Sequence, residues 1–270
     1  KFLILFSILF IGLLIIRNHD DFNYYHLTYS LGLTEHKIFM GLGQFSHGYR
    51  YHSSLFFFNS IIFLPYIKYY LFHSLGWFTL VFVNYIILDF LLFNKVKELK
   101  FEYFFYLFLI LFINIKFSRI GGYGTDLSSQ MILMTIFPLI YLTLQTDIKS
   151  NLFKSNLFII ILLITYTVTL KSFFILSFLF LISFLFLYDF KKIFNIVFFS
   201  KTFIFSIILI LLLIAVNLAY TGCAIYPVKS TCLSNQLSWA LEKDYVERMY
   251  NWLQQWSKSG ASSTYRVENP

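Results

Sequence analysis

The sequence predicts an all-α membrane protein, and three observations support this fold class. Of the 270 residues, 59% are hydrophobic and only 13% are charged, whereas soluble domains carry about 25% charged residues. Apolar segments recur along the chain at the length that a helix needs to cross a bilayer. The basic residues gather beside these segments, as membrane topology requires, so the net charge of +8 does not indicate nucleic-acid binding.

Seven apolar segments are predicted to be transmembrane helices. The 36 Phe and 20 Tyr within and around them are interpreted as packing and lipid-contact residues rather than as a binding site. The sequence shows no obvious internal repeat, no glycine-rich phosphate loop, no zinc-ligand spacing and no nucleophile elbow. The predicted spans are 1–16, 74–93, 102–117, 129–146, 156–170, 172–189 and 202–220.

A further apolar stretch, residues 55–70, decides the topology. If it spans the membrane, the lysine-rich loop 95–100 lies on the same side as Asp20; if it lies in the interface, that loop lies on the opposite side. Pro65 and Lys68 favour a broken interfacial helix. With this stretch in the interface, the short inner loops hold most of the lysines, as the positive-inside rule requires. The inner-loop lysines are then Lys95, Lys97, Lys100, Lys149, Lys154, Lys191, Lys192 and Lys201.

In this topology the outer face carries a long first loop, 17–73, with interfacial helices, and a polar tail, 221–270. We therefore divide the chain into a transmembrane module, 1–220, and an outer segment, 221–270. The chain starts at Lys1 rather than at Met and ends in a polar run, 262–270, a pattern typical of a fragment.

The outer segment contains both cysteines, Cys223 and Cys232. A pair on the non-cytoplasmic side predicts a disulfide, which would contribute roughly 2.5–3 kcal/mol by closing a loop of about ten residues; two unpaired thiols are the alternative. A helix is predicted to follow and to stop near Gly260. Its apolar face consists of Leu237, Leu241, Tyr245, Met249, Leu253 and Trp256.

Two adjacent carboxylates, Asp20 and Asp21, follow the first predicted span directly. At the edge of a membrane such a carboxylate can act as a general base toward an acceptor hydroxyl. Two neighbouring like charges that are partly desolvated also raise one of the two pKa values. The alternative is a solvated loop with helix-capping aspartates.

Two cations stand at predicted outer ends of spans, Arg119 and Lys171. Phosphate is a natural partner for both, because Arg binds it through a fork of donors and Lys through a point charge. Arg119 begins a glycine-rich stretch that ends at Asp126, where the next span opens. The alternatives are an ion pair of Arg119 with Asp126 or a headgroup contact, and snorkelling of Lys171 to the interface.

A run of hydrogen-bonding residues, 41–54, follows in the first outer loop and could line a pocket for a sugar; an ordered interfacial loop is the alternative. We count Arg50, His26 and His47 with the candidate substrate-binding residues. All six histidines lie in this loop, but their spacing repeats no known ligand pattern, so we assign no metal site.

The order of these parts resembles the GT-C glycosyltransferases that use polyprenyl-phosphate sugars. The resemblance rests on the acidic pair after the first span, the polar loop 119–126, and the basic residues at outer ends. The chain resembles more closely a poorly characterised bacterial membrane-protein family near that superfamily. The motifs that carry this second resemblance are Tyr25-His26-Leu27, the run 41–47, His52-Ser53-Ser54-Leu55-Phe56 and the run 221–227.

The resemblance implies an integral transferase of the bacterial inner membrane with its active face outward. It would move a sugar from a polyprenyl-phosphate donor to a glycan or lipid of the cell envelope, with Asp20 or Asp21 as base and Arg119, Lys171 and Arg50 near the donor phosphate. A divalent cation is a possible cofactor, since metal dependence varies in the superfamily. The alternatives are an O-antigen polymerase or ligase, a lipid or glycan transporter, and an assembly protein.

Overall fold

The computed structural model describes residues 2–13, 21–93, 101–115 and 125–259. These residues form helices joined by turns and contain no β-strand, so the all-α prediction is confirmed for the part of the chain described. Within these ranges, four helices are long and apolar enough to cross a membrane, which indicates that the chain is a membrane protein. They cover Tyr69–Leu92, Thr125–Leu144, Asn151–Leu170 and Lys201–Thr221.

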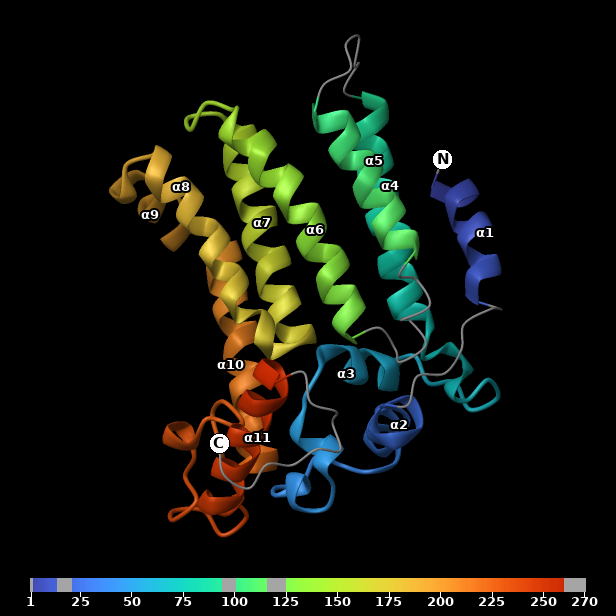
Figure 1. The fold of residues 1–270 in the computed structure, drawn as a ribbon, viewed down its shortest axis with the longest axis vertical. Coiled ribbons are helices and arrows are strands. Elements are labelled where there is room, and N and C mark those ends of the chain that lie inside the picture. Colours follow the sequence, from blue (N-terminus) through green and yellow to red (C-terminus); the bar gives the residue numbers. More distant parts are fainter. Residues whose placement is uncertain (1, 14–20, 94–100, 116–124, 260–270) are drawn as a thin grey trace. The chain divides into compact units, whose positions relative to one another are not determined.

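The helices are labelled in chain order in Figure 1. Short helical turns separate several of them and are given the letter η. The α-helices are α1 (Phe2–Leu13), α2 (Leu27–Glu35), α3 (Ser54–Ile61), α4 (Ser74–Phe93), α5 (Phe101–Ile115), α6 (Thr125–Leu144), α7 (Asn151–Leu170), α8 (Ile182–Leu187), α9 (Phe190–Phe198), α10 (Lys201–Thr221) and α11 (Lys243–Ser259). The turns are η1 (Phe22–His26), η2 (Leu42–Gln44), η3 (His47–Arg50), η4 (Tyr69–Leu71), η6 (Ser172–Leu181) and η7 (Lys229–Thr231).

The chain forms two compact units. Unit 1 comprises residues 1–34 and 53–210, and unit 2 comprises residues 35–52 and 211–270. This division differs from the modules 1–220 and 221–270 suggested by the sequence. The reason is that a stretch of the first loop makes its backbone hydrogen bonds with the C-terminal part of the chain, as described below.

In unit 1, α4 packs against α1, α5 and α6, and α6 packs along α7 (Figure 1). The α6 and α7 faces carry small hydroxyl residues, and the side chains of Ser129, Thr135, Thr165 and Thr167 are buried. Their hydroxyls donate to backbone carbonyls of their own helices. Small residues of this kind let two membrane helices approach closely without leaving a polar group unsatisfied.

An amide pair joins α4 to α5. The side-chain nitrogen of Asn114 donates to the Asn84 side-chain oxygen at 2.6 Å, and that of Asn84 donates back at 3.4 Å. Asn84 is buried beside an apolar cluster that includes Leu80, Ile87 and Ile113. The pair therefore gives two otherwise apolar helices a polar contact that fixes their register.

Residues 172–189, predicted as a regular span, adopt a different conformation. They begin as the tight 3-10 turn η6 and continue as α8, and together the apolar segment runs over Ser172–Leu187. A 3-10 helix rises about 2.0 Å per residue, compared with 1.5 Å in an α-helix. The segment is therefore about 29 Å long, close to the roughly 30 Å thickness of a bilayer core.

The stretch 55–70 contains no long helix. Its helical part, α3, covers 8 residues, or about 12 Å, and a turn around Lys68, whose φ is 55°, ends the apolar run. Because the bilayer core is roughly 30 Å thick, α3 is too short to cross it. This agrees with the interfacial alternative.

Unit 2 joins residues that lie far apart in the sequence. The Gly41 amide donates to the Ala219 carbonyl at 2.8 Å, and the Gln44 side chain donates to the Trp239 carbonyl at 2.7 Å. Gly41 has a φ of 79°, in the left-handed region that glycine adopts without strain. These bonds hold η2 against the end of α10 and the segment before α11.

The predicted disulfide is present in unit 2. Cys223 and Cys232 are bonded, and Cys223 packs with Tyr226, Leu241 and Val246 in a small apolar core. Gly222, just before the first cysteine, has a φ of 73°, and a side chain at this position would overlap Ala240. The disulfide and this close approach together fix the start of the C-terminal segment.

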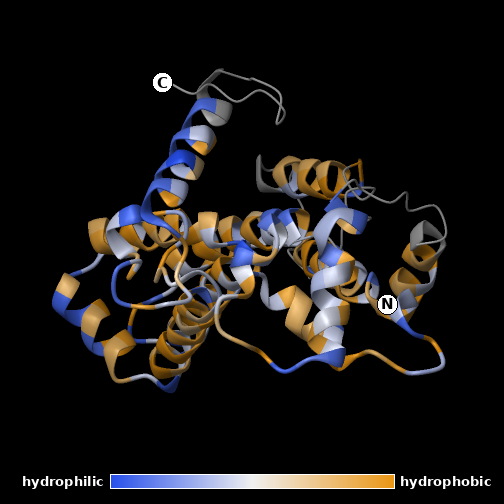
Figure 2. Ribbon diagram, turned by 90° about the horizontal axis from the view of Figure 1, so that it is seen from below, coloured by the Kyte–Doolittle hydropathy of each residue, from blue (hydrophilic) through white to orange (hydrophobic). Residues whose placement is uncertain are grey.

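The predicted C-terminal helix begins later than the sequence suggests. Leu237 and Leu241 lie before α11, in turns whose backbone groups have other partners: the Leu241 amide donates to the Thr221 carbonyl at 3.0 Å. The prediction that they belong to the helix is therefore wrong. Figure 2 shows α11, which leads to the C-terminus, as mainly hydrophilic, in contrast to the membrane-length helices. Gly260, the predicted stop, lies outside the described residues.

Candidate active site

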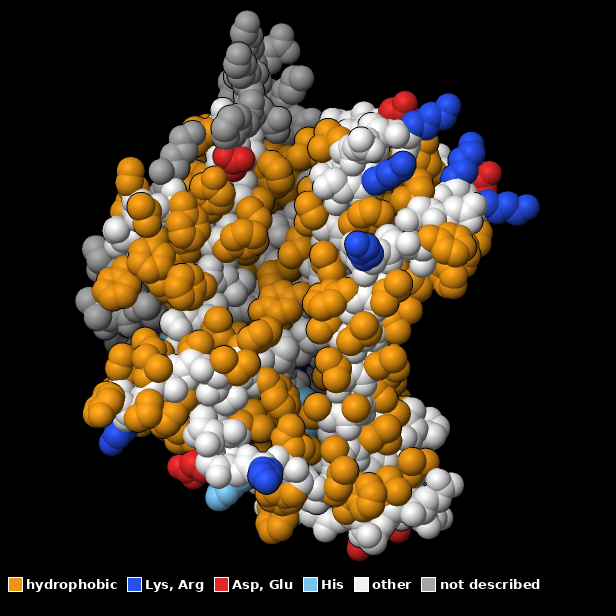
Figure 3. All heavy atoms as spheres, turned by 180° about the vertical axis from the view of Figure 1, so that it is seen from behind, with side chains coloured by type: hydrophobic (Ala, Val, Ile, Leu, Met, Phe, Trp, Pro, Cys, Tyr) orange, Lys and Arg blue, Asp and Glu red, His pale blue; other side chains and the backbone are white. Residues whose placement is uncertain are grey.

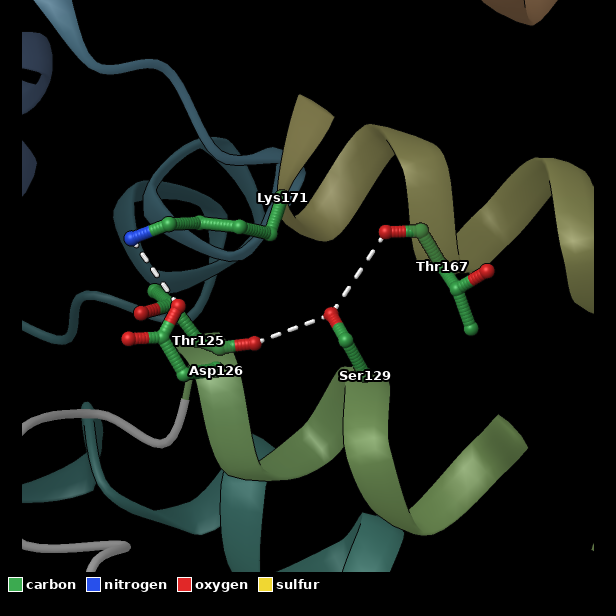
Figure 4. A network of polar contacts seen from close by, with 5 residues as sticks. All are labelled: Thr125, Asp126, Ser129, Thr167 and Lys171. Carbon is green, nitrogen blue, oxygen red and sulfur yellow. Dashed lines mark hydrogen bonds and ion pairs between the residues drawn. The ribbon is translucent and has the colours of Figure 1, made fainter. Parts of the chain in front are cut away.

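Asp126 and Lys171 form an ion pair at one end of the α6–α7 pair (Figure 4). The Lys171 Nζ atom lies 2.9 Å from Asp126 Oδ1, and the side chains are 34% and 59% exposed, respectively. Asp126 is in the first turn of α6, and Lys171 directly follows the last residue of α7. The carboxylate thus stands at a helix N-terminus and the ammonium at a helix C-terminus, where each helix dipole favours the charge present.

The ends of the two helices are held by a hydroxyl beneath this pair. The buried Ser129 hydroxyl lies 3.0 Å from the Thr125 carbonyl of α6 and 3.5 Å from the Thr167 carbonyl of α7 (Figure 4). The Lys171 amide donates to the same Thr167 carbonyl at 3.0 Å, and the extended backbone of Lys171 then ends α7. The position of the ion pair is therefore set by buried backbone contacts rather than by its own attraction.

Because the ion pair is partly exposed, it contributes little to stability. Such pairs are worth about 0–1 kcal/mol. An anionic ligand can therefore take Lys171 away from Asp126 at low cost, while Asp126 keeps the ammonium oriented when no ligand is bound. This is a suitable arrangement for a cation that binds a phosphate oxygen reversibly.

The acidic pair and Arg119 are described only in part. Asp21 is half-buried and stands directly before η1, where its side chain makes no capping hydrogen bond to the helix. Asp20 and Arg119 lie outside the described residues. His26 is buried, with its ring 4.2 Å from that of Tyr25 and 5.0 Å from that of Phe56.

Arg50 forms a second polar centre, within unit 2. Arg50 is buried, with 9% of the residue exposed. The Nε atom donates to the Gly43 carbonyl at 2.6 Å, and Nη1 donates to the Tyr245 hydroxyl. The guanidinium carbon also lies 4.4 Å from the centre of the Tyr245 ring. Arg50 therefore links the turn at Gly43 to the first turn of α11.

Two further tyrosines complete the surroundings of Arg50. Burial raises the pKa of Tyr51 to about 12 and raises that of Tyr226 further, although a hydrogen bond with Arg50 opposes the second shift. Both phenols are therefore neutral at physiological pH. In the described part of the chain no carboxylate lies within ion-pair distance of Arg50. Among these residues, its positive charge is therefore stabilised by hydrogen bonds to neutral oxygens and by the Tyr245 ring, and not by a carboxylate.

Sequence reasoning identified Arg50 but not its tyrosine partners. Tyr245 was assigned to an apolar helix face, and nothing in the local sequence pairs it with a residue of the first loop. His47 is half-buried beside this cluster, with its ring 4.9 Å from that of Tyr51 and 6.3 Å from that of Trp252. The one available signal was the aromatic-rich run Tyr49-Arg50-Tyr51, in which a cation stands between phenols.

The buried imidazole of His52 is expected to make the stability of unit 2 depend on pH. Burial lowers the pKa of its imidazole to about 3, compared with about 6.5 in an unfolded chain. Below pH 6.5 the unfolded chain therefore binds a proton that the folded chain does not bind until about pH 3. We expect the free energy of unfolding to fall as the pH is lowered through this range, by at most about 1.4 kcal/mol for each pH unit from this group.

The comparison that tests this is between the native protein and His52→Phe, unfolded in detergent at pH 7 and pH 4.5. The native protein should lose more stability between the two pH values than the variant does. Equal losses in the two proteins would show that His52 does not carry this dependence.

The structure places the other candidate residues separately. Asp126 and Lys171 are brought together in unit 1, whereas Arg50 and His47 belong to unit 2. Within the described ranges no group of three or more His, Cys, Asp or Glu side chains could hold a metal ion. The candidate residues described above include cations, hydroxyls and phenols, which suit an oxyanion or a sugar.

Residues 1–269 match the family model described as "Domain of unknown function (DUF8201)". The chain belongs to this family. This single match covers both structural units of the DUF8201 chain, unit 1 with the ion pair of Asp126 and Lys171 and unit 2 with the Arg50 cluster. Searches of curated proteins and of solved structures found no match.

Proposed function

We propose that this DUF8201 protein is an inverting glycosyltransferase that moves a sugar from a polyprenyl-phosphate donor to a cell-envelope glycan or lipid. The observation that supports this best is the Lys171–Asp126 pair: a cation at the end of a membrane-length helix, held weakly by a partly exposed carboxylate. A lipid-linked phosphate has its charge at this depth, where the apolar chain meets water. Lys171 would bind the phosphate, and Asp126 would orient Lys171 between turnovers.

The remaining roles follow the sequence. Asp20 or Asp21 would take the proton of the acceptor hydroxyl, and Arg119 would join Lys171 in neutralising the phosphate as it leaves. The assignment of Arg50, His26 and His47 to substrate binding stays a prediction. The use of a divalent cation as cofactor also stays a prediction. The reaction needs a base and a phosphate clamp on one face of the membrane, and the GT-C resemblance supplies the expected arrangement.

The topology in this proposal has seven spans and an active face that points outward from the bacterial inner membrane. Four helices already have the required length and composition, and η6 with α8 has about the same length as the bilayer core. The short α3 leaves Asp21 and Lys171 on one side when α1 and α5 also span. The lysines that follow α6 and α8 would then face the cytoplasm.

The test is sugar transfer by the purified protein in proteoliposomes, with polyprenyl-phosphate-linked glucose, mannose and N-acetylglucosamine as donors. We expect Lys171→Met to lower kcat/KM roughly 10- to 100-fold, because a hydrogen bond to a charged group contributes about 1.5–3 kcal/mol. Lys171→Arg should restore most of the activity. Asp126→Asn should change it only a few-fold, since the ammonium keeps its charge.

Two results would count against the proposal. One is a native protein that neither transfers nor is stabilised by any of these donors while it remains folded. The other is a Lys171→Met variant with unchanged kcat/KM, which would remove Lys171 from the phosphate site even if transfer occurs.

A further inference from the structure

Helix α9 has one buried residue, Ile193, and two exposed lysines, Lys191 and Lys192. It also carries an exposed apolar column, which consists of Phe190, Phe194 and Phe198 at a spacing of four residues. A helix that combines exposed aromatic residues with exposed basic residues has the pattern of a helix that lies in a membrane interface.

The aromatic column is ordered by stacking. The rings of Phe190 and Phe194 are stacked with centres 5.8 Å apart, and those of Phe194 and Phe198 with centres 4.9 Å apart. Phe203, in the first turn of α10, extends the column, with its ring 5.4 Å from that of Phe198. The column thus continues from α9 directly onto a membrane-length helix.

Lysines surround this column at one end of unit 1. Three lie on or next to α9, and two more lie at the turn between α6 and α7 and in the first turns of α7. Tyr188, just before α9, holds the two groups together, because its hydroxyl donates to the Leu144 carbonyl at 3.3 Å. Figure 3 shows Lys and Arg side chains gathered at the end of the molecule that carries α8 and α9. The five residues, called the lysine patch below, are Lys149, Lys154, Lys191, Lys192 and Lys201.

The nearby carboxylates offset only part of the positive charge of the lysine patch. Asp147 accepts a hydrogen bond from the Lys149 amide, and Asp189 accepts one from the Lys191 amide, so both cap turns of the backbone. In the part of the chain that the structure describes, no carboxylate lies within ion-pair distance of the lysine patch. The patch therefore keeps an excess of positive charge beside exposed phenylalanine rings.

We propose that α9 and the lysine patch bind anionic phospholipid at the membrane surface. The phenylalanine column would enter the boundary between headgroups and acyl chains, and the ammonium groups would bind lipid phosphates. Anionic lipid fits better than neutral lipid, because several unpaired cations lie within reach of one surface and each basic residue adds to the attraction. The binding would not depend on the sugar-transfer site at Lys171.

The experiment is native mass spectrometry of the full chain in detergent, titrated with phosphatidylglycerol or phosphatidylcholine. The native protein should retain phosphatidylglycerol in preference to phosphatidylcholine. Replacing Lys191, Lys192 and Lys201 together with glutamine should weaken phosphatidylglycerol binding at least tenfold, since each lysine near a charged membrane surface contributes about a fivefold factor. Phosphatidylcholine binding should hardly change.

A matched control removes the same amount of charge elsewhere. Lys37, Lys68 and Lys243 are exposed and lie outside the lysine patch, so the triple glutamine variant at these positions should bind phosphatidylglycerol like the native protein. Circular dichroism of both variants is measured to check that they are folded. Equal loss in the two variants would mean that net charge alone attracts the lipid, and no loss in the first would mean that the lysine patch binds no lipid; either result overturns the proposal.

A second variant tests the aromatic column. Phe190→Ser with Phe194→Ser and Phe198→Ser should raise amide hydrogen exchange in α9 when the protein is in phosphatidylglycerol-containing nanodiscs, because the helix loses its anchor. Protection equal to that of the native protein would exclude insertion of this face into the lipid.

Discussion

Replacing Asp20 and Asp21 together with asparagine is expected to abolish sugar transfer. General-base catalysis contributes about 10²- to 10⁴-fold, and an amide cannot accept the proton of an acceptor hydroxyl. The rate constant should fall by that factor, while donor binding changes little because the phosphate clamp is intact. Transfer of labelled sugar in proteoliposomes measures the rate, and quantification of the protein in the membrane fraction corrects for expression.

The single substitutions assign the role to one residue. Asp20→Asn and Asp21→Asn are compared, and the aspartate whose replacement causes the larger loss of transfer is the base. The control is the double variant Glu242→Gln with Asp244→Asn, which removes two carboxylates at the start of α11. It should stay active, because both side chains are exposed and have no role in the proposed reaction. Full activity in the Asp20–Asp21 double variant would remove the acidic pair from the mechanism.

The second large effect is expected on stability, at Arg50. Changing Arg50 to methionine leaves the Gly43 carbonyl and the Tyr245 hydroxyl without their buried donor. Each buried polar group that loses its partner costs about 1–3 kcal/mol, so we expect a loss of about 3 kcal/mol or more. Lysine should restore only part of it, because it cannot reproduce the planar fork of the guanidinium.

Tryptophan fluorescence during thermal unfolding in detergent follows this change, since Trp239 and Trp252 both belong to unit 2. Arg248→Met is the matched control: Arg248 is exposed and its guanidinium lies 6.0 Å from the same Tyr245 ring. It should unfold at nearly the native temperature. If Arg50→Met also unfolds at the native temperature, the Arg50 contacts carry no net stability. A double-mutant cycle with Tyr245→Phe then isolates the term that belongs to the pair.

The four membrane-length helices of the described residues could be predicted because each is a long apolar segment. The predicted spans 129–146 and 156–170 begin a few residues later than α6 and α7 do, because the first turns of these helices contain Ser, Thr and Asn residues that lower the local hydropathy. The 3-10 conformation of η6 was not predictable. Apart from Ser172 and Ser177 its sequence is apolar, and periodicity cannot distinguish 3.0 from 3.6 residues per turn when nearly every position is apolar.

The candidate site was predicted as a set of residues but not as a set of contacts. Lys171 and Asp126 stand at the ends of predicted spans, which is why both were identified. Their pairing depends on how α6 packs against α7, and the sequence analysis considered an ion pair of Asp126 only with Arg119, as an alternative to phosphate binding by Arg119. The Arg50–Tyr245 contact was missed for the same reason, because it joins two segments whose association no local pattern encodes.

The composition of unit 2 has a consequence for how the protein is made. Residues 35–52 leave the ribosome long before their hydrogen-bond partners, Ala219 and Trp239, are synthesised. The first loop must therefore wait, with the Arg50 guanidinium still unburied, until α10 has been inserted and the segment after it has emerged. Unit 2 is then completed late in biogenesis. A ribosome stalled after residue 210 would expose a nascent chain in which residues 35–52 lack their hydrogen-bond partners.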